Sequence, residues 1–281
     1  MGTWRDRKRY FWLLGLAVPL QAVVMWALVH ATGSGVFWWW GPIFVFGILP
    51  VLDRAVGLDG ENPPEELVAA LEADRYYRWA TYLFLPLQYA AFFWACWQLS
   101  TDLTVTDKVG LAVTIGLLNG VAINTAHELG HKRDTLERWL SKVALAPTAY
   151  GHFYVEHNRG HHVRVATPED PASSRLGETF YQFWPRTVVG SLRSAWELES
   201  RQWSKAGRSR WNVRNDVLNA WAMTAVLAAV LLIPLALGAG AVLRARKWRR
   251  TVKAGGRTEP PPLPSSYRGG AEEQKNLASQ P

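Results

Sequence analysis

Cysteine is almost absent from this chain of 281 residues, because Cys96 is the only one. A single cysteine excludes a disulfide-stabilised secreted domain and an iron–sulfur cluster held by four thiolates. The sequence also contains no glycine-rich nucleotide-binding motif and no haem attachment motif. A redox reaction carried out by this chain would therefore need electrons from another protein.

Charged residues are also scarce. They make up 19% of the sequence, where a soluble domain has about 25%. Hydrophobic residues make up 49%, and 16 residues are Trp. The net charge of +8 is concentrated in residues 244–281, which hold nine Lys and Arg against three Glu. The rest of the chain is close to neutral, so it lacks the basic groove typical of nucleic-acid binding, and we expect no nucleic-acid partner.

Long apolar runs stand where charge is missing. Uncharged segments of 18 or more residues cover 11–29, 35–52, 79–101, 109–126 and 217–243. A helix needs about 20 apolar residues to cross the hydrocarbon core of a bilayer. The sequence therefore predicts an all-α fold, a polytopic membrane bundle with five spans, and excludes a soluble globular domain.

Three segments between these runs have patterns of their own. Pro63-Pro64-Glu65-Glu66 predicts a short surface helix over 65–76, because proline and acids favour a helix N-terminus. Residues 143–155 are apolar but too few to span, which predicts a buried or re-entrant segment. Residues 176–198 mix aromatic and charged side chains, which is typical of a helix in the membrane interface.

The same patterning predicts the domains and the orientation. We expect a membrane domain over 1–243 and a basic, proline-rich tail over 244–281 that buries too little surface to fold. Positive residues favour the cytoplasmic side of spans. The basic N-terminus and the Lys132-Arg133 pair then place the end of the fourth span, at His127, in the cytoplasm.

Six of the seven histidines lie between positions 127 and 162. His127 and His131 are four residues apart, so on a helix they share one face. His157 and His161 have the same spacing, while on an α-helix His162 is rotated by about 100° and would reach a second ion. Imidazoles at the end of membrane helices are costly to bury without a partner. We therefore predict a metal site formed by His127, His131, His157, His161 and His162.

The roles of the neighbouring side chains are less specific. Glu128 and Glu156 are predicted to accept hydrogen bonds from ligand imidazoles, or else to be ordinary polar residues at helix ends. His152 precedes His157 by five residues and is either a further ligand or a core residue. His30 is expected in the membrane interface. No catalytic side chain beyond the metal ligands is evident.

The spacing leaves the metal open. His127-Glu128-Leu129-Gly130-His131 matches the zinc-protease motif, in which the glutamate is the general base. A zinc hydrolase needs only three protein ligands and one open position, so five histidines exceed its needs. Imidazole suits iron as well as zinc.

Three motifs together resemble those of the membrane-bound alkane 1-monooxygenases, which belong to the integral-membrane histidine-box di-iron class that includes fatty-acid desaturases. They are HELGHK at 127–132, EHNRGHH at 156–162 and ATPEDP at 166–171. The resemblance covers about 1–235. It implies that His127 and His131 of the first box, and His157, His161 and His162 of the second, ligate two non-haem irons. It also implies hydroxylation of the terminal carbon of n-alkanes with O2, rubredoxin and its reductase as electron source, and a bacterial inner-membrane location.

The chain departs from that family after residue 235. The family has a sixth span, a Glu-His pair and a third histidine box, whereas no histidine follows His162 here. We therefore expect impaired hydroxylation. The tail, 244–281, is of the kind that a shifted reading frame or a truncated gene would give, or else is a native basic tail at the membrane surface. The alternatives are a membrane zinc metalloprotease and a truncated membrane protein without catalysis.

Overall fold

The computed structural model of the protein describes residues 6–57 and 63–232, and within these ranges the chain forms helices and loops and no strand. The chain divides into two compact units, Met1–Leu227 and Ala228–Pro281. The histidines lie in the first. In chain order the helices are η1 (Arg9–Leu16), α1 (Ala17–Thr32), η2 (Gly35–Trp39), α2 (Trp40–Pro42), η3 (Ile43–Ile48), α3 (Leu49–Val56), α4 (Glu65–Ala73), α5 (Arg75–Leu99), α6 (Val105–His131), α7 (Thr135–Leu145), η4 (Ala146–Thr148), α8 (Phe153–Glu156), η5 (His157–His161), α9 (His162–Arg164) and α10 (Phe180–Lys205). A further helix covers Asp216–Leu232.

Three continuous helical stretches of the described residues have the length and apolar composition of a membrane span. They are Arg9–Thr32, Gly35–Val56 and Val105–His131. They confirm the helices predicted at 11–29, 35–52 and 109–126. The prediction of an all-α, multi-pass membrane protein is therefore correct.

The other two predicted spans fare differently. The run 79–101 is helix α5, which is long enough to span but less apolar than the three stretches above. The run 217–243 begins as the helix Asp216–Leu232, and its remainder lies outside the described residues, as does the predicted tail 244–281.

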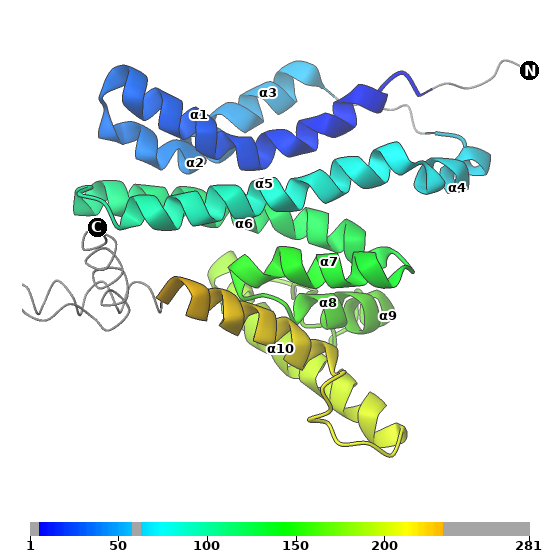
Figure 1. Ribbon diagram of the computed structural model, residues 1–281. Coiled ribbons are helices and arrows are strands. Elements are labelled where there is room, and N and C mark those ends of the chain that lie inside the picture. Colours follow the sequence, from blue (N-terminus) through cyan, green and yellow to red (C-terminus); the bar gives the residue numbers. More distant parts are fainter. Residues whose placement is uncertain (1–5, 58–62, 233–281) are drawn as a thin grey trace, which may run out of the picture. The chain divides into compact units, whose positions relative to one another are not determined.

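Helices α5 and α6 lie side by side, with α1 against both of them and α7 against α6 (Figure 1). The second stretch docks on α6 through Thr114, whose hydroxyl donates to the Trp38 carbonyl at 2.8 Å and accepts from the Gly41 backbone N–H at 2.9 Å. A Cβ atom at Gly41 would lie 2.7 Å from the Thr114 Cα atom. Only glycine permits this close approach of the two helices. The contact joins the second stretch to the middle of α6.

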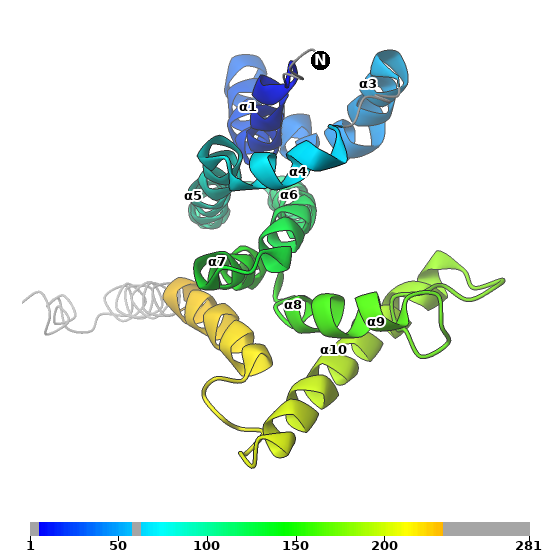
Figure 2. The same cartoon turned by 90° about the vertical axis from the view of Figure 1, so that its right-hand side faces the viewer.

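The segment between α7 and α10 carries the second histidine group. Leu145 and Val155 are fully buried, which confirms that 143–155 is a buried segment and not a span. Helix α8, the turn η5 and helix α9 follow one another, and α8 and η5 pack against α10 (Figure 2). The exposed helix α4 confirms the surface helix predicted over 65–76, whereas the interfacial position of α10 stays a prediction.

Candidate metal centre

The first histidine pair lies in the last two turns of α6. Because His127 and His131 are four residues apart, their Nε2 atoms approach to 3.1 Å. The neighbouring backbone is fixed by α7, since the Ser141 hydroxyl donates to the Ala126 carbonyl at 2.6 Å. The pair is therefore held at the end of a long membrane helix and has little freedom to move along it.

The second group lies on a π-helical turn, η5. This turn is wider than an α-helical one, so residues five apart share a face. His157 Nε2 accordingly lies 3.0 Å from His162 Nε2. On an α-helix, as predicted from the spacing, His162 would be rotated by about 100° away from His161 and could reach a second ion. The additional residue in the turn corrects that geometry and brings His162 to the same side as His157.

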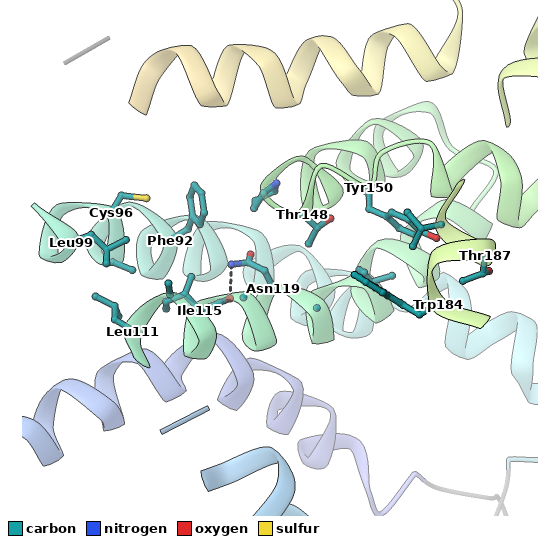
Figure 3. Close-up of a pocket in the computed structure, with 17 residues that line it drawn as sticks. Phe92, Cys96, Leu99, Leu111, Ile115, Asn119, Thr148, Tyr150, Trp184 and Thr187 are labelled. Atoms are coloured by element: carbon teal, nitrogen blue, oxygen red, sulfur yellow. Dashed lines mark hydrogen bonds between the residues drawn. The ribbon is translucent and has the colours of Figure 1, made fainter. Parts of the chain in front are cut away.

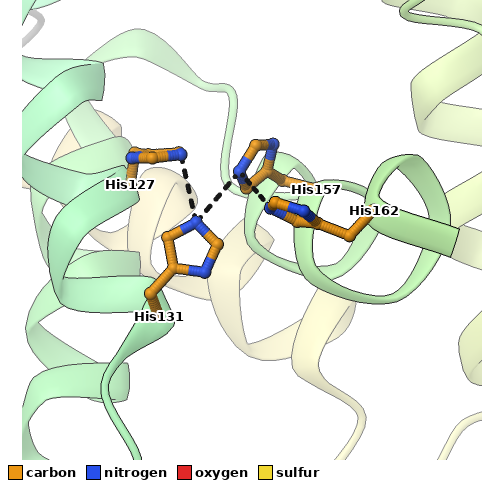
Figure 4. Close-up of side chains that lie close together, drawn as sticks. All are labelled: His127, His131, His157 and His162. Atoms are coloured by element: carbon orange, nitrogen blue, oxygen red, sulfur yellow. Dashed lines mark hydrogen bonds between the residues drawn. The ribbon is translucent and has the colours of Figure 1, made fainter. Parts of the chain in front are cut away.

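The two groups meet. His157 Nε2 lies 3.2 Å from His131 Nε2, and Figure 4 shows the four rings of His127, His131, His157 and His162 turned towards one another. Each offers one nitrogen, and these nitrogens all lie within 4.8 Å of one another. Adjacent ligands bonded to one ion at about 2 Å lie about 3 Å apart. The set fits a metal for which imidazole is a suitable donor, such as iron or zinc.

The protonation of the central ring also suits metal binding. Burial, together with the neighbouring imidazoles of His127 and His162, lowers the pKa of His157 to about 4. The ring is therefore neutral near pH 7, and neutral imidazole is the form that ligates metals.

His161 stands beside these four histidines. Its ring stacks on that of His157 with 5.5 Å between centroids, while its Nδ1 atom lies 2.8 Å from Asp170 Oδ2. Such a carboxylate orients an imidazole and leaves the other ring nitrogen available to a metal. The structure thus sets His161 apart from the convergent four, although it belongs to the same histidine box.

Asp170 is a candidate site residue that the sequence analysis missed. It is almost fully buried and also accepts from the Ser173 hydroxyl at 2.6 Å and the Ala172 N–H at 3.0 Å. Burial alone would raise its pKa, but the hydrogen bonds from Ser173, Ala172 and His161 lower it. The signal was present, because Asp170 lies in the ATPEDP motif nine residues after His161.

The two glutamates predicted to support the ligands differ. The Glu128 carboxylate lies 3.4 Å from His127 Nδ1 and is largely exposed, which is compatible with the predicted role. Glu156 is buried, and its Oε1 atom accepts from Arg164 Nη2 at 2.8 Å. Its observed partner is therefore an arginine and not a ligand histidine.

The two remaining histidines lie outside the cluster of four. His30 Nδ1 lies 2.8 Å from the Trp26 carbonyl, near the exposed end of α1. His152 is 3% exposed, and neither of its ring nitrogens has a hydrogen-bond partner among the described residues. His152 thus behaves as a buried core imidazole beside Tyr150, with 4.5 Å between ring centroids.

An apolar pocket of about 710 Å³ lies between α5, α6, residues 147–150 and the first turns of α10 (Figure 3). Helix α6 contributes Ala112, Gly116 and Ile123 to its lining. Their spacing of four and seven residues places them on one helical stripe, and one turn further on this stripe reaches His127. The pocket thus follows the face of α6 that leads to the histidines.

Comparison with known proteins gives consistent results. Residues 108–248 match the fatty acid desaturase family. The chain is 44% identical over 230 residues to alkane 1-monooxygenase 1 of Alcanivorax borkumensis, which covers 81% of this chain and 56% of that protein. It is 44% identical over 228 residues to alkane 1-monooxygenase of Pseudomonas putida (81% and 57%). It is 46% identical over 224 residues to that of Acinetobacter baylyi (78% and 55%).

The chain spans somewhat more than half the length of these curated relatives. The family match includes both histidine boxes, the whole of η5 and the Asp170 loop. On the strength of that match, which extends over half of the sequence, the chain belongs to the fatty acid desaturase family.

Proposed function

We propose that this protein is a membrane non-haem di-iron monooxygenase that hydroxylates the terminal carbon of n-alkanes. The observation that carries the proposal is the convergence of four Nε2 atoms at the end of α6. Similarity to alkane 1-monooxygenases supports the substrate class. The reaction places one atom of O2 in the alcohol and reduces the other to water, with two electrons and two protons.

The residues of the chain have separable roles in this proposal. His127, His131, His157 and His162 would hold metal through their ring nitrogens, and His161, oriented by Asp170, is available as a fifth ligand. Iron, when bound, supplies the oxidising power that a C–H bond requires, because such a bond offers nothing to acid–base catalysis. The apolar pocket can exclude water and align a hydrocarbon that is already dissolved in the bilayer.

Electrons come, in this proposal, from rubredoxin and its reductase at the cytoplasmic face of a bacterial inner membrane. Arg133 and Arg138, which follow the first histidine box in the chain, are exposed. Their positive charges suit an acidic carrier. The same charges suit a cytoplasmic orientation, since positive residues are retained on that side.

A zinc metalloprotease that uses the His127-Glu128-Leu129-Gly130-His131 motif fits the geometry less well. Catalytic zinc keeps three protein ligands and one open position. Here four imidazole nitrogens lie within 4.8 Å of one another, which is one imidazole more than such a site needs. The number of imidazoles therefore supports the redox proposal rather than the hydrolytic one.

The proposal is tested with membranes from cells that express the full chain. They are supplied with rubredoxin, its reductase, reduced nicotinamide cofactor, a series of n-alkanes and isotopically labelled O2. We expect labelled primary alcohol, identified by gas chromatography and mass spectrometry, above the level in membranes that carry His157→Ala. Alcohol no higher than in that control, from a chain that retains iron, would overturn the proposal.

A further inference from the structure

Arg159 lies between two of the candidate ligands, His157 and His161, on the π-helical turn η5. Its side chain points away from them into a group of charged residues. The guanidinium forms an ion pair with Glu199, donates to Gln202, and contacts Asp216 Oδ2 at 2.8 Å. Arg159 therefore connects the ligand-bearing turn to α10 and to the start of the helix Asp216–Leu232.

A second cation completes this group. Lys142, on α7, contacts Asp216 Oδ1 at 2.9 Å and is 2% exposed. Glu199 is 1% exposed, and its Oε2 atom also accepts from the Asp216 backbone N–H at 2.9 Å. The group thus contains two cations and two anions, which balance one another. We call Arg159, Lys142, Glu199 and Asp216 the charge network.

The buried members of the charge network, Lys142 and Glu199, depend on the partly exposed Asp216 and Arg159 for their opposite charges. Removing one partner from a buried ion pair leaves an uncompensated charge, and this is strongly destabilising. The planar guanidinium of Arg159 forms ion pairs with Glu199 and Asp216 at the same time, whereas a single ammonium group has no such fork. Arg159 therefore fixes the position and the rotation of η5 relative to α10 and to the helix Asp216–Leu232.

We infer that Arg159 is a positioning residue, which holds the π-helical turn so that His157 and His162 face His127 and His131. The inference rests on the proposed metal function for its consequence, but the positioning itself belongs to the metal-free protein. Loss of the Arg159 contacts lets the turn relax, and the Nε2 atoms of His157 and His162 then lose their common direction.

Lys142 provides a matched control from the same network. It shares Asp216 with Arg159, yet it lies on α7 and not on the ligand-bearing turn. Lys142→Met removes a more deeply buried charge than Arg159→Met, while it leaves the contacts of Arg159 with Glu199 and Gln202 in place. General loss of stability would therefore affect both variants, whereas loss of positioning affects only Arg159→Met.

The first measurement is amide hydrogen exchange on the metal-free, detergent-solubilised full chain. Arg159→Met should accelerate exchange in peptides covering 157–164, and Lys142→Met should not. Arg159→Lys keeps the charge without the fork and provides a variant with a milder perturbation, for which we expect an intermediate rate. Unchanged exchange in 157–164 for both Arg159 variants would overturn the inference, whatever the metal does.

The second measurement is Co²⁺ binding, followed by visible absorption and by competition with a chelator. We expect about tenfold weaker affinity and an altered spectrum for Arg159→Met, at the lower end of what supporting residues of metal sites contribute. Lys142→Met should retain the wild-type spectrum. Equal losses in the two variants would overturn the inference. A wild-type chain that binds no Co²⁺ would contradict the metal proposal alone, and hydrogen exchange would still decide the positioning.

Discussion

Asp170 distinguishes His161 from the other histidines at the scale of single residues. Four imidazoles face one another without an acidic neighbour as close as the one that His161 has at 2.8 Å. A buried carboxylate on one ring nitrogen fixes both the tautomer and the orientation of an imidazole. The orientation of the His161 ring therefore depends on Asp170, which lies in the loop between α9 and α10.

Replacing Asp170 by Asn tests this dependence. The amide keeps the size of the side chain but loses the charge that favours the Nδ1–H tautomer, so we expect iron retention to fall by about tenfold or more. The measurement is iron per chain after dialysis against a mild chelator. Glu169→Gln is the control, because Glu169 is adjacent and exposed. Equal iron retention in the two variants would contradict the role of Asp170.

The residue scale also shows how far the sequence alone could lead. His127 and His131 were predictable as a pair, because residues four apart share one face of a helix. The approach of His162 to His157 was not, because it depends on the π-helical turn. Asp170 lies in a motif that the sequence displays, but its contact with His161 was not predictable, since a loop forms that contact and no periodic pattern describes a loop. Glu156 was assigned a ligand-supporting role, but burial beside Arg164 gave it a different partner.

The approach of α6 to the second histidine group belongs to the scale of helices. It occurs over Gly130, where a Cβ atom would lie 3.1 Å from Ser141 Oγ, 3.3 Å from Asn158 Nδ2 and 3.4 Å from Tyr154 Cδ2. These distances are tighter than ordinary carbon contacts. Gly130 therefore lets the two ligand-bearing segments come close enough for their Nε2 atoms to meet.

Gly130→Ala should push these segments apart. Overpacking costs about 1–3 kcal/mol, against about 0.5–1 kcal/mol gained from alanine in a helix, so we expect a lower unfolding temperature and weaker metal retention. Gly116→Ala is the matched control, because the same helix has open space there. It should be neutral or slightly stabilising. Identical thermal unfolding of the two variants in detergent would show that Gly130 has no special role.

The loop before α10 is held by a bidentate ion pair between Arg186 and Glu178. Arg186 binds both oxygens of Glu178, at 2.6 and 2.7 Å, and donates to the Ser173 carbonyl at 2.9 Å. The hydrogen bonds from Arg186 lower the pKa of Glu178 from 4.5 to about 2. This pair closes the loop that contains Asp170.

The lowered pKa predicts how stability depends on pH. Above its ordinary value of 4.5 the Glu178 carboxylate contributes its full stabilisation, which is lost as the pH falls from about 4.5 towards about 2. Glu178→Gln should therefore flatten the unfolding temperature across this range. Glu197→Gln, in an exposed pair with Arg201, is the control and should leave the profile unchanged. An unchanged profile for Glu178→Gln would contradict the assignment.

Helices show a similar division between what the sequence predicts and what it does not. Their positions follow from apolar runs of membrane length, and three of these runs coincide with helical stretches long and apolar enough to span a membrane. The π-helical turn at His157–His161 was not predictable, because no simple sequence pattern distinguishes a single π-helical turn from an α-helical one. Arg159, within this turn, makes tertiary contacts with Glu199 and Asp216.

At the scale of the molecule, the described residues of Met1–Leu227 combine an apolar bundle with a histidine site at the end of helix α6. Helix α6 takes part in both, since its middle packs on the second membrane stretch and its last turns carry His127 and His131. The apolar pocket follows the same helix. Within Met1–Leu227, a hydrocarbon in the pocket and a metal at the histidines would therefore share α6 as their common wall.

The central claim is that these histidines hold iron, and X-ray absorption of the purified, iron-loaded full chain tests it most directly. We predict an iron first shell of nitrogen or oxygen atoms at about 2.1 Å, with imidazole scattering beyond it, as expected for histidine ligands. His157→Ala should lose most of the iron, and His30→Ala should retain it. Iron without imidazole scattering, or the same iron content in both variants, would contradict the account.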